Sequence, residues 1–516
     1  MRAVVSHHRL CSLVDDLIAD LQRLISEPSI QRGGANVEPE NLRFGGGVSG
    51  TVFNPAVAVI LIFAGVLICI LPQKRAFVPF LLTSILIPGD QVLVLAGLHF
   101  TLLRLLILFG MIRIFIIKGR GDWNVFSRGL NRVDKLVILL ALASAVAGVL
   151  LFENTQAFIF QLGNLYDAFG AYFLVRCLIR DREDVVRVIR VLAIIVIALG
   201  GVMIFERLNG WNPYALLGGA KASYFATDLD RDGRIRATGS FGTPILAGVF
   251  GAVSLPLFIG LLLSDRKQRA VAVLGMLGAT VMTLASNSST PVMGYLAGLV
   301  GICLWPIRGL TRIIRWSIVI TLVSLHLVMK APVWHLITRF DISGSSYHRY
   351  ALINETIRHF SEWWLIGTAS NTAWGWDMWD LCNQYVAHAI NGGLLSLTLF
   401  VAIIVYGFKY VGHARKAAMD RKQELFFWAL GSALLAHTIS FFGISYWDQS
   451  IVGWYVILGF IGAVAAPQTV QATVAPLDPE IAEADPASLR WWEQPSISRR
   501  RVHAPLQQHQ SKPRLY

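Results

Sequence analysis

The sequence predicts an all-α membrane protein that crosses the bilayer about twelve times. Hydrophobic residues fill 55% of its 516 positions and charged residues only 15%, with a mean hydropathy of +0.57. Soluble proteins average about 25% charged residues, so this composition indicates a chain embedded in lipid. Two further observations support the prediction: the apolar residues fall into stretches of span length, and Lys and Arg gather in alternate loops.

Twelve apolar stretches are each long enough, at about 20 residues, to cross the hydrocarbon core as a helix. They lie near residues 55–71, 91–117, 135–152, 157–179, 186–206, 241–263, 270–286, 289–306, 313–330, 384–408, 424–443 and 449–466. A further apolar piece, residues 77–87, is too short to span and contains Pro79. We interpret it as a half-inserted or re-entrant segment, with a short tilted helix as the alternative.

The basic residues predict the orientation, because Lys and Arg near span ends stay on the cytoplasmic side. Five loops are rich in them, near residues 118–135, 180–190, 266–269, 308–315 and 409–422. The loops between these are assigned to the outer face, including two long ones at 207–240 and 331–383. Both termini are then cytoplasmic, and the net charge of +13 reflects this bias and not a nucleic-acid-binding surface.

Three regions are predicted along the chain. Residues 1–54 form a cytoplasmic segment with an amphipathic helix, because apolar residues at helical spacing alternate there with aspartates. Residues 55–466 form the membrane domain, and the Pro-, Gln- and Arg-rich residues 467–516 form a disordered cytoplasmic tail. The five cysteines are scattered without a C-x-x-C pair, so neither a disulfide framework nor a cysteine metal site is expected.

The first long outer loop ends in a run from Arg236 through Ala-Thr-Gly-Ser-Phe-Gly-Thr to Pro244, which opens a span. A guanidinium at the outer mouth of a helix bundle suits a phosphate or pyrophosphate, and the glycines let the backbone approach it. An interfacial anchor is the alternative. The acidic turn at residues 228–233 begins like a calcium loop, but position twelve is Gly239 and not a carboxylate. We therefore predict no metal ion.

The second long outer loop combines basic, aromatic and acidic residues. Residues 347–360, which include His348 and Arg349, have the periodicity of a helix lying along the membrane surface. Five tryptophans follow within seventeen residues, interleaved with Asp377 and ending just before Asp380. Rings and carboxylates together suit stacking and hydrogen bonding to sugars, whereas a plain interfacial aromatic belt is the alternative.

Arginines inside the apolar stretches are costly and mark either function or structural pairing. Arg104 lies near the middle of the stretch at 91–117, where a functional residue and a structural ion pair are both open. Arg113 and Arg176 lie close to inner span ends, where snorkelling of the side chain to the interface is expected.

Taken together, residues 53–462 resemble the O-antigen ligase and O-antigen polymerase family of bacterial envelope polysaccharide enzymes. Three segments carry the resemblance: the run from Arg236 to Pro244, the His348-Arg349 helix with Trp364-Leu-Ile-Gly367, and Asn383-Gln-Tyr385 leading into Gly392-Gly393. The resemblance implies a metal-independent, inverting glycosyltransferase without a cofactor. Such an enzyme would transfer glycan from an undecaprenyl pyrophosphate carrier at the periplasmic face of the bacterial inner membrane, in O-antigen or exopolysaccharide biosynthesis.

The resemblance also implies roles for individual residues. Arg236 and Arg349 would hold the pyrophosphate leaving group, with Arg104 as a third candidate, because guanidinium groups stabilise the developing negative charge. The candidate sugar-binding residues are Trp374, Trp376, Trp379, Asn383 and Tyr385. The partners implied are the lipid-linked glycan, membrane lipids and other polysaccharide-assembly proteins.

Two departures from the family pattern concern catalysis. The family has a His immediately before the Asn of the Asn383 segment, where this chain has Cys382, and a thiol is a poor general base near neutral pH. We therefore assign the base to Asp380, with His348 as the runner-up and His388 as a further candidate. The family also often has an Arg where this chain reads Ser-Asn-Ser-Ser at 286–289.

Two other functions compete with the enzyme. A transporter or flippase for lipid-linked glycans would line its path with Arg104 and His326, but the sequence has neither an inverted repeat nor paired broken spans. A non-catalytic component of a polysaccharide export complex would account for the missing family histidine.

Overall fold

The computed structural model describes residues 50–119, 129–218, 230–231, 234–339 and 346–465. The amphipathic helix predicted before residue 50 and the tail predicted from residue 467 lie outside the described residues, as does most of the acidic turn at 228–233. Helices make up most of the described chain, and the strands form two short antiparallel hairpins.

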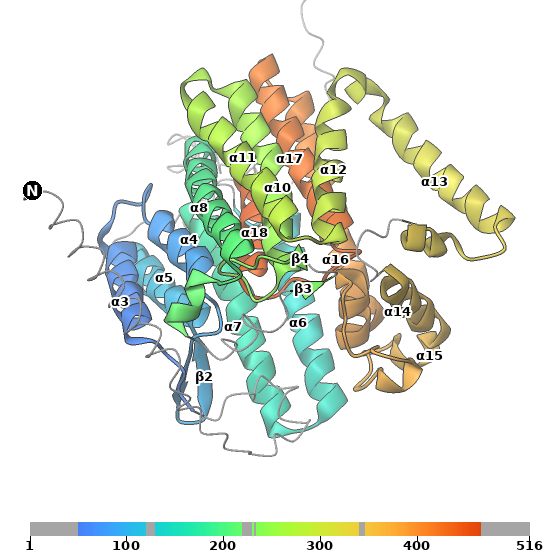
Figure 1. The fold of residues 1–516 in the computed structure, drawn as a ribbon, viewed down its shortest axis with the longest axis horizontal. Helices are drawn as coiled ribbons and strands as arrows, with labels where there is room; N and C mark the ends of the chain where they lie inside the picture. Colours follow the sequence, from blue (N-terminus) through green and yellow to red (C-terminus); the bar gives the residue numbers. More distant parts are fainter. Residues whose placement is uncertain (1–49, 120–128, 219–229, 232–233, 340–345, 466–516) are drawn as a thin grey trace, which may run out of the picture. The chain divides into compact units, whose positions relative to one another are not determined.

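A helix lies in each of the twelve apolar stretches (Figure 1). The apolar stretches contain the helices α3 (Pro55–Ile70), α4 (Phe77–Leu86), α5 (Leu102–Gly119), α6 (Arg132–Phe152), α7 (Thr155–Leu178), α8 (Arg182–Asn209), α10 (Pro244–Ser264), α11 (Arg269–Ala285), α12 (Ser289–Cys303), α13 (Thr311–Val328), α16 (Gln384–Lys416), α17 (Arg421–Ser440) and α18 (Gln449–Phe460). Further elements are the helices α14 (Ser346–Arg358) and α15 (Phe360–Trp363), and the hairpins β1 (Val92–Leu95) with β2 (Leu98–Thr101) and β3 (Asp230–Arg231) with β4 (Arg234–Ile235).

Five helices of the described chain are long and apolar enough to cross a membrane. They are Arg132–Phe152, Arg182–Asn209, Pro244–Ser264, Trp305–Val328 and Gln384–Lys416. The protein is therefore a largely helical protein with the character of a membrane protein. None of the described residues of α13 is buried, and this helix stands apart from the bundle in Figure 1. An apolar helix without protein neighbours on its faces is suited to contact with lipid.

Local sequence signals set where several helices begin. Asn131 caps α6 in a capping box with Asp134, and Asn154 and Asp181 cap α7 and α8 through side-chain oxygens. Thr243 caps α10, whose first residue is Pro244. Proline at this position loses no helical hydrogen bond, so the outer loop ends sharply at the start of the helix.

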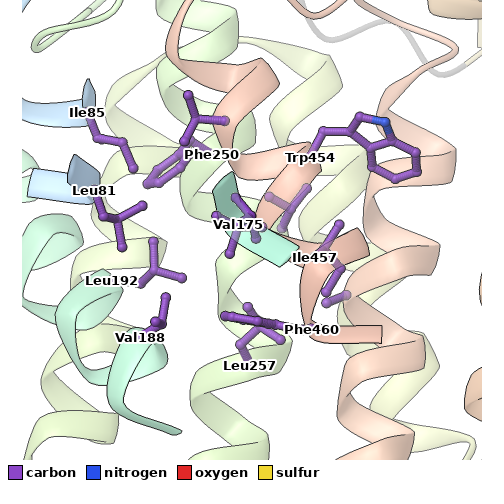
Figure 2. Close-up of a cluster of buried hydrophobic side chains, with 14 of the residues drawn as sticks. Leu81, Ile85, Val175, Val188, Leu192, Phe250, Leu257, Trp454, Ile457 and Phe460 are labelled. Carbon is purple, nitrogen blue, oxygen red and sulfur yellow. The ribbon is translucent and has the colours of Figure 1, made fainter. Parts of the chain in front are cut away.

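The core surrounds α10, which packs against α8, α11, α12 and α17. Figure 2 shows part of this core, where Phe250 and Leu257 of α10 meet Leu192 of α8 and Ile457 of α18. Small residues allow close helix contacts: a Cβ added to Gly278 of α11 would lie 2.8 Å from the Val196 carbonyl oxygen of α8. Such close approach is typical of helix packing in membranes.

The stretch at 91–117 does not begin as a helix. Residues 92–101 form the β1–β2 hairpin, whose turn residues Ala96 and Gly97 have φ values of 51° and 77°. Positive φ at both turn residues matches the twist of a hairpin. Helix α5 starts only at Leu102, so Arg104 lies in its first turn and not in the middle of a span.

Helix α4 occupies the residues for which a re-entrant segment or a short tilted helix is predicted. Before the helix, the Lys74 carbonyl oxygen accepts a hydrogen bond from Arg187 of α8 at 2.8 Å. After the helix, the Ile87 carbonyl oxygen accepts from Gln449, the first residue of α18, at 3.2 Å. The ten residues of α4 are fewer than a full span usually needs, and its two ends are bound to different helices.

Arg176 is not a snorkelling side chain as expected. It is fully buried, and its Nε donates at 2.8 Å to Oδ1 of Asp134, which is also fully buried. Arg113 is buried as well and donates to the Ile68 carbonyl oxygen at 2.6 Å. Both guanidinium groups find partners inside the helix bundle, which is less costly than leaving a charge in an apolar interior.

Candidate functional site

The segment that carries Arg236 is held by a buried carboxylate. Glu206, near the end of α8, accepts hydrogen bonds from the backbone N–H groups of Thr238 at 3.0 Å and Gly239 at 2.9 Å. Gly239 has φ of +58°, a conformation that favours glycine. Arg236, half-buried, donates from Nη2 to the Ser288 hydroxyl at 2.8 Å.

Arg349 approaches the neighbouring residues from the second long loop. It lies on α14, is buried, and donates from Nε to the Gly443 carbonyl oxygen at 3.1 Å. The Thr290 hydroxyl donates to the same oxygen at 3.2 Å. Ser288 and Thr290 flank the first residue of α12, so Arg236 is linked to the N-terminus of this helix directly and Arg349 through the Gly443 carbonyl oxygen.

This arrangement is suited to an anion. The first N–H groups of a helix lack helical partners, and the helix dipole places partial positive charge at its N-terminus. Two permanent guanidinium charges beside such an end add to this field, and planar guanidinium groups pair well with phosphate oxygens. Ser288, which Arg236 contacts, lies in the run at 286–289 where the resemblance leads one to expect an arginine.

The candidate bases also come together. One ligand atom from each of His348, Asp380 and Cys382 lies within 4.8 Å of the others. The His348 Nε2 atom lies 3.1 Å from the Asp380 carbonyl oxygen. Because His348 and Arg349 are consecutive on α14, one candidate base and one candidate phosphate ligand are held by the same helix.

The surroundings of these groups shift their protonation. Asp380 is an exposed residue, but partial burial of its carboxyl group raises the pKa of that group. His348 and Arg349 oppose this rise in pKa, and Asp377 adds to it. Burial raises the pKa of the Cys382 thiol to about 12, and the Asp380 charge adds to this shift. The pKa of Asp380 is thus shifted toward the neutral range in which a general base works, whereas the pKa of the thiol is shifted away from it.

Imidazole, carboxylate and thiol at this spacing are also ligand types that Zn²⁺ accepts. The sequence predicted no metal, and that remains a prediction. Cys382 packs in a small core of the second outer loop that also contains Leu352, Trp363 and Trp374. This core gives the thiol a packing role whether or not a metal binds.

The five predicted sugar-binding residues do not form one surface. Trp376 and Trp379 are 86% and 69% exposed. Trp374 is buried, stacks on the His359 ring at 4.8 Å, and donates from Nε1 to Glu362 at 2.9 Å. Only the two exposed rings offer a free face for stacking on a sugar.

Asn383 and Tyr385 have structural partners instead. The Asn383 side-chain oxygen caps α16 by accepting from the backbone N–H groups of Tyr385 and Val386. The Tyr385 hydroxyl donates to the Thr438 carbonyl oxygen at 3.0 Å. Asn383 therefore fixes the start of α16, and Tyr385 joins this helix to the end of α17, so these residues position the loop.

Arg104 is separate from the other two arginines. Its Nε lies 3.1 Å from both carboxylate oxygens of Asp167, and its Nη1 donates to the His99 carbonyl oxygen at 2.7 Å. These contacts support the structural ion pair over a role in binding pyrophosphate. His326, the other residue expected in a transport path, lies on α13, far from α5 in Figure 1. His388 hydrogen-bonds Gln384 and packs on Phe400 within α16.

Sequence reasoning missed three contributors to the site: Glu206, Thr290 and the turn around Gly443. The Ser-Ser-Thr-Pro run at 288–291 was the available signal for a helix start, since proline is favoured in the first turn of a helix. No family model matches the chain, and a search of curated proteins finds no match either.

Proposed function

We propose that this protein is a membrane glycosyltransferase of the O-antigen ligase and polymerase type. It takes glycan from an undecaprenyl-pyrophosphate-linked donor and transfers it to an acceptor sugar at the outer face of the bacterial inner membrane. The observation that carries the proposal is that Arg236 is bonded to Ser288 at the start of α12 while Arg349 shares the Gly443 carbonyl oxygen with Thr290 of the same helix.

In the proposed reaction, a hydroxyl oxygen of the acceptor sugar attacks the anomeric carbon of the donor. A new C–O bond forms, and the bond between that carbon and the pyrophosphate oxygen breaks with inversion. The two electrons of the broken bond leave with the lipid pyrophosphate, whose added charge Arg236, Arg349 and the helix end stabilise. The acceptor proton passes to the Asp380 carboxylate.

The cluster around Asp380 supports the assignment of the base to Asp380 and of the pyrophosphate contact to Arg349. His348 is adjacent to Arg349, so the helix that aligns the phosphate ligand also fixes the carbonyl of Asp380. The exposed rings of Trp376 and Trp379 lie on the same loop as Asp380 and are the candidates for holding a sugar there. Other proteins of polysaccharide assembly are the natural source of the lipid-linked donor.

The proposed topology adds α4 to the twelve predicted spans, for thirteen crossings. The backbone N–H of Asn54 donates to Gln91, whose side chain bonds the Leu217 carbonyl oxygen of the first outer loop. Helix α3 then starts at the outer face, and Lys74 and Arg75 after its end lie in the cytoplasm. This placement agrees with the rule that basic residues near span ends stay on the cytoplasmic side. In this proposed topology the described chain begins outside, where the sequence predicts a cytoplasmic start, and ends inside after α18.

The direct test supplies purified protein in liposomes with an undecaprenyl-pyrophosphate-linked oligosaccharide, and measures release of the lipid pyrophosphate with and without acceptor. Acceptor-dependent release supports transfer. Movement of intact donor across the bilayer without release indicates a flippase. Neither release nor movement, under conditions where the protein is folded, supports a non-catalytic role in export.

A further inference from the structure

A second polar site lies among other helices of the same bundle. A cavity of about 380 Å³ is enclosed by the start of α5, the middle of α7, the segment before β1 and the start of α18. This volume falls within the range of about 300 to 1,000 Å³ that is usual for small-molecule sites. None of the residues predicted from the sequence as site residues lines it.

The wall of the cavity is fixed to the Arg236 segment. The Gln449 side chain donates from Nε2 to the Ser240 carbonyl oxygen at 2.7 Å. Gly242 packs against the ring of Trp447, where an added Cβ would lie 2.5 Å from the indole. The turn that carries the Gly443 carbonyl, bonded to Arg349, continues directly into Trp447 and Asp448. The cavity and the arginine site therefore share two supporting segments.

The polar lining of the cavity disfavours an anion. Three carboxylate residues line it, namely Asp90, Asp167 and Asp448, and no Lys or Arg does so among the described lining residues. Arg104 lies behind Asp167 and forms an ion pair with it. The like charge of these carboxylates repels a phosphate or a carboxylate that faces them.

The remaining lining residues favour a sugar ring. Trp447 and Tyr455 supply aromatic surface, and Asn164 supplies an amide that both donates and accepts hydrogen bonds. Carboxylate oxygens accept hydrogen bonds from hydroxyl groups, which a sugar offers in several directions. An apolar lipid chain would offer these polar groups no hydrogen bonds.

We propose that this cavity binds an uncharged sugar unit. That the sugar belongs to the growing or donated glycan rests on the proposed function, whereas binding of the sugar itself does not. The cavity then selects a neutral part of the glycan while the arginines hold its pyrophosphate.

The test is saturation-transfer NMR on the full-length protein in nanodiscs. The probes are glucose, galactose and N-acetylglucosamine, with glucuronate and glucose 1-phosphate as charged counterparts of glucose. At least one neutral sugar should receive saturation, and the two anions should receive little. Asn164→Leu should weaken binding about tenfold, as expected for the loss of a hydrogen bond worth about 1.4 kcal/mol. Ala168→Trp, which fills the cavity, should abolish it.

Further variants test the specificity of the cavity. Arg358→Ala should leave neutral-sugar binding unchanged, because Arg358 is an exposed residue of α14 that does not line the cavity. Asp448→Asn should reduce the discrimination against glucuronate. If Ala168→Trp does not fold, Asn164→Leu decides alone. The proposal is overturned if none of the neutral sugars binds, if their binding survives these cavity variants, or if glucuronate binds as well as glucose. Sugar binding without donor turnover would reject the proposed function and keep the cavity site.

Discussion

The Nε atom of Arg349 lies 3.1 Å from the carbonyl oxygen of Gly443, an oxygen that also accepts the Thr290 hydroxyl. This shared acceptor ties the second outer loop to the turn after α17 and to the start of α12. Because Arg349 is buried and held through Nε, its guanidinium plane is fixed before any ligand arrives. A fixed donor is what stabilisation of a leaving group requires.

Asp380→Asn should lower the transfer rate by about 10² or more, because the amide cannot accept the acceptor proton. In the wild type, the rate should rise as Asp380 loses its proton, and the acid limb should lie above the usual Asp pKa of about 3.9, since its pKa is raised. The measurement is the pH profile of transfer. An unchanged profile in Asp380→Asn together with an inactive His348→Ala would move the base to His348.

Cys382→Ser should keep its activity, because burial raises the thiol pKa to about 12 and leaves the thiol uncharged at neutral pH. Cys382→His, which restores the family pattern, should be tolerated or more active. Chelation with EDTA should leave the rate of the wild type unchanged. Loss of activity on chelation, with recovery on adding Zn²⁺, would instead make His348, Asp380 and Cys382 a metal site.

Asp134→Ala should destabilise the protein by about 3 to 5 kcal/mol, because it leaves the fully buried Arg176 without its ion-pair partner. Thermal unfolding in detergent measures the loss. The matched control is Glu183→Ala, which removes a highly exposed ion pair with Lys74 and should change stability little. Equal effects of the two variants would show that the Asp134 pair is not buried in the membrane-embedded protein.

Cysteine accessibility tests the crossing by α4. In a background whose native cysteines are replaced, Cys at Lys74 should be protected from a membrane-impermeant thiol reagent in intact spheroplasts, and Cys at Gly97 should react. Tags at Gly375 and Arg415 should be exposed and protected, respectively. A re-entrant segment predicts the same accessibility for Lys74 and Gly97, so that result would restore the sequence-based topology.

The helices were predictable because span length and apolar composition are local properties. The β1–β2 hairpin was not, since its strands are as apolar as the helix that follows, and the Ala96-Gly97 turn was the only local cue. The site was predictable in part. The two arginines could be predicted because they are basic residues next to the ends of apolar stretches. The role of Asn383 depends on capping of α16, and that of Tyr385 depends on a carbonyl oxygen 53 positions away in the sequence. Such tertiary partners leave no periodic signal in the sequence.

The most direct measurement compares Arg349→Lys and Arg236→Lys with Arg358→Lys in release of lipid pyrophosphate from a lipid-linked oligosaccharide. Arg358 lies on the same helix as Arg349, but is exposed and paired with Glu355. A lysine cannot reproduce a planar fork, so both site variants should lose about 10- to 100-fold in rate, equivalent to roughly 1 to 3 kcal/mol, and Arg358→Lys should match the wild type. Wild-type release by both site variants would contradict the central claim that these arginines hold the leaving pyrophosphate.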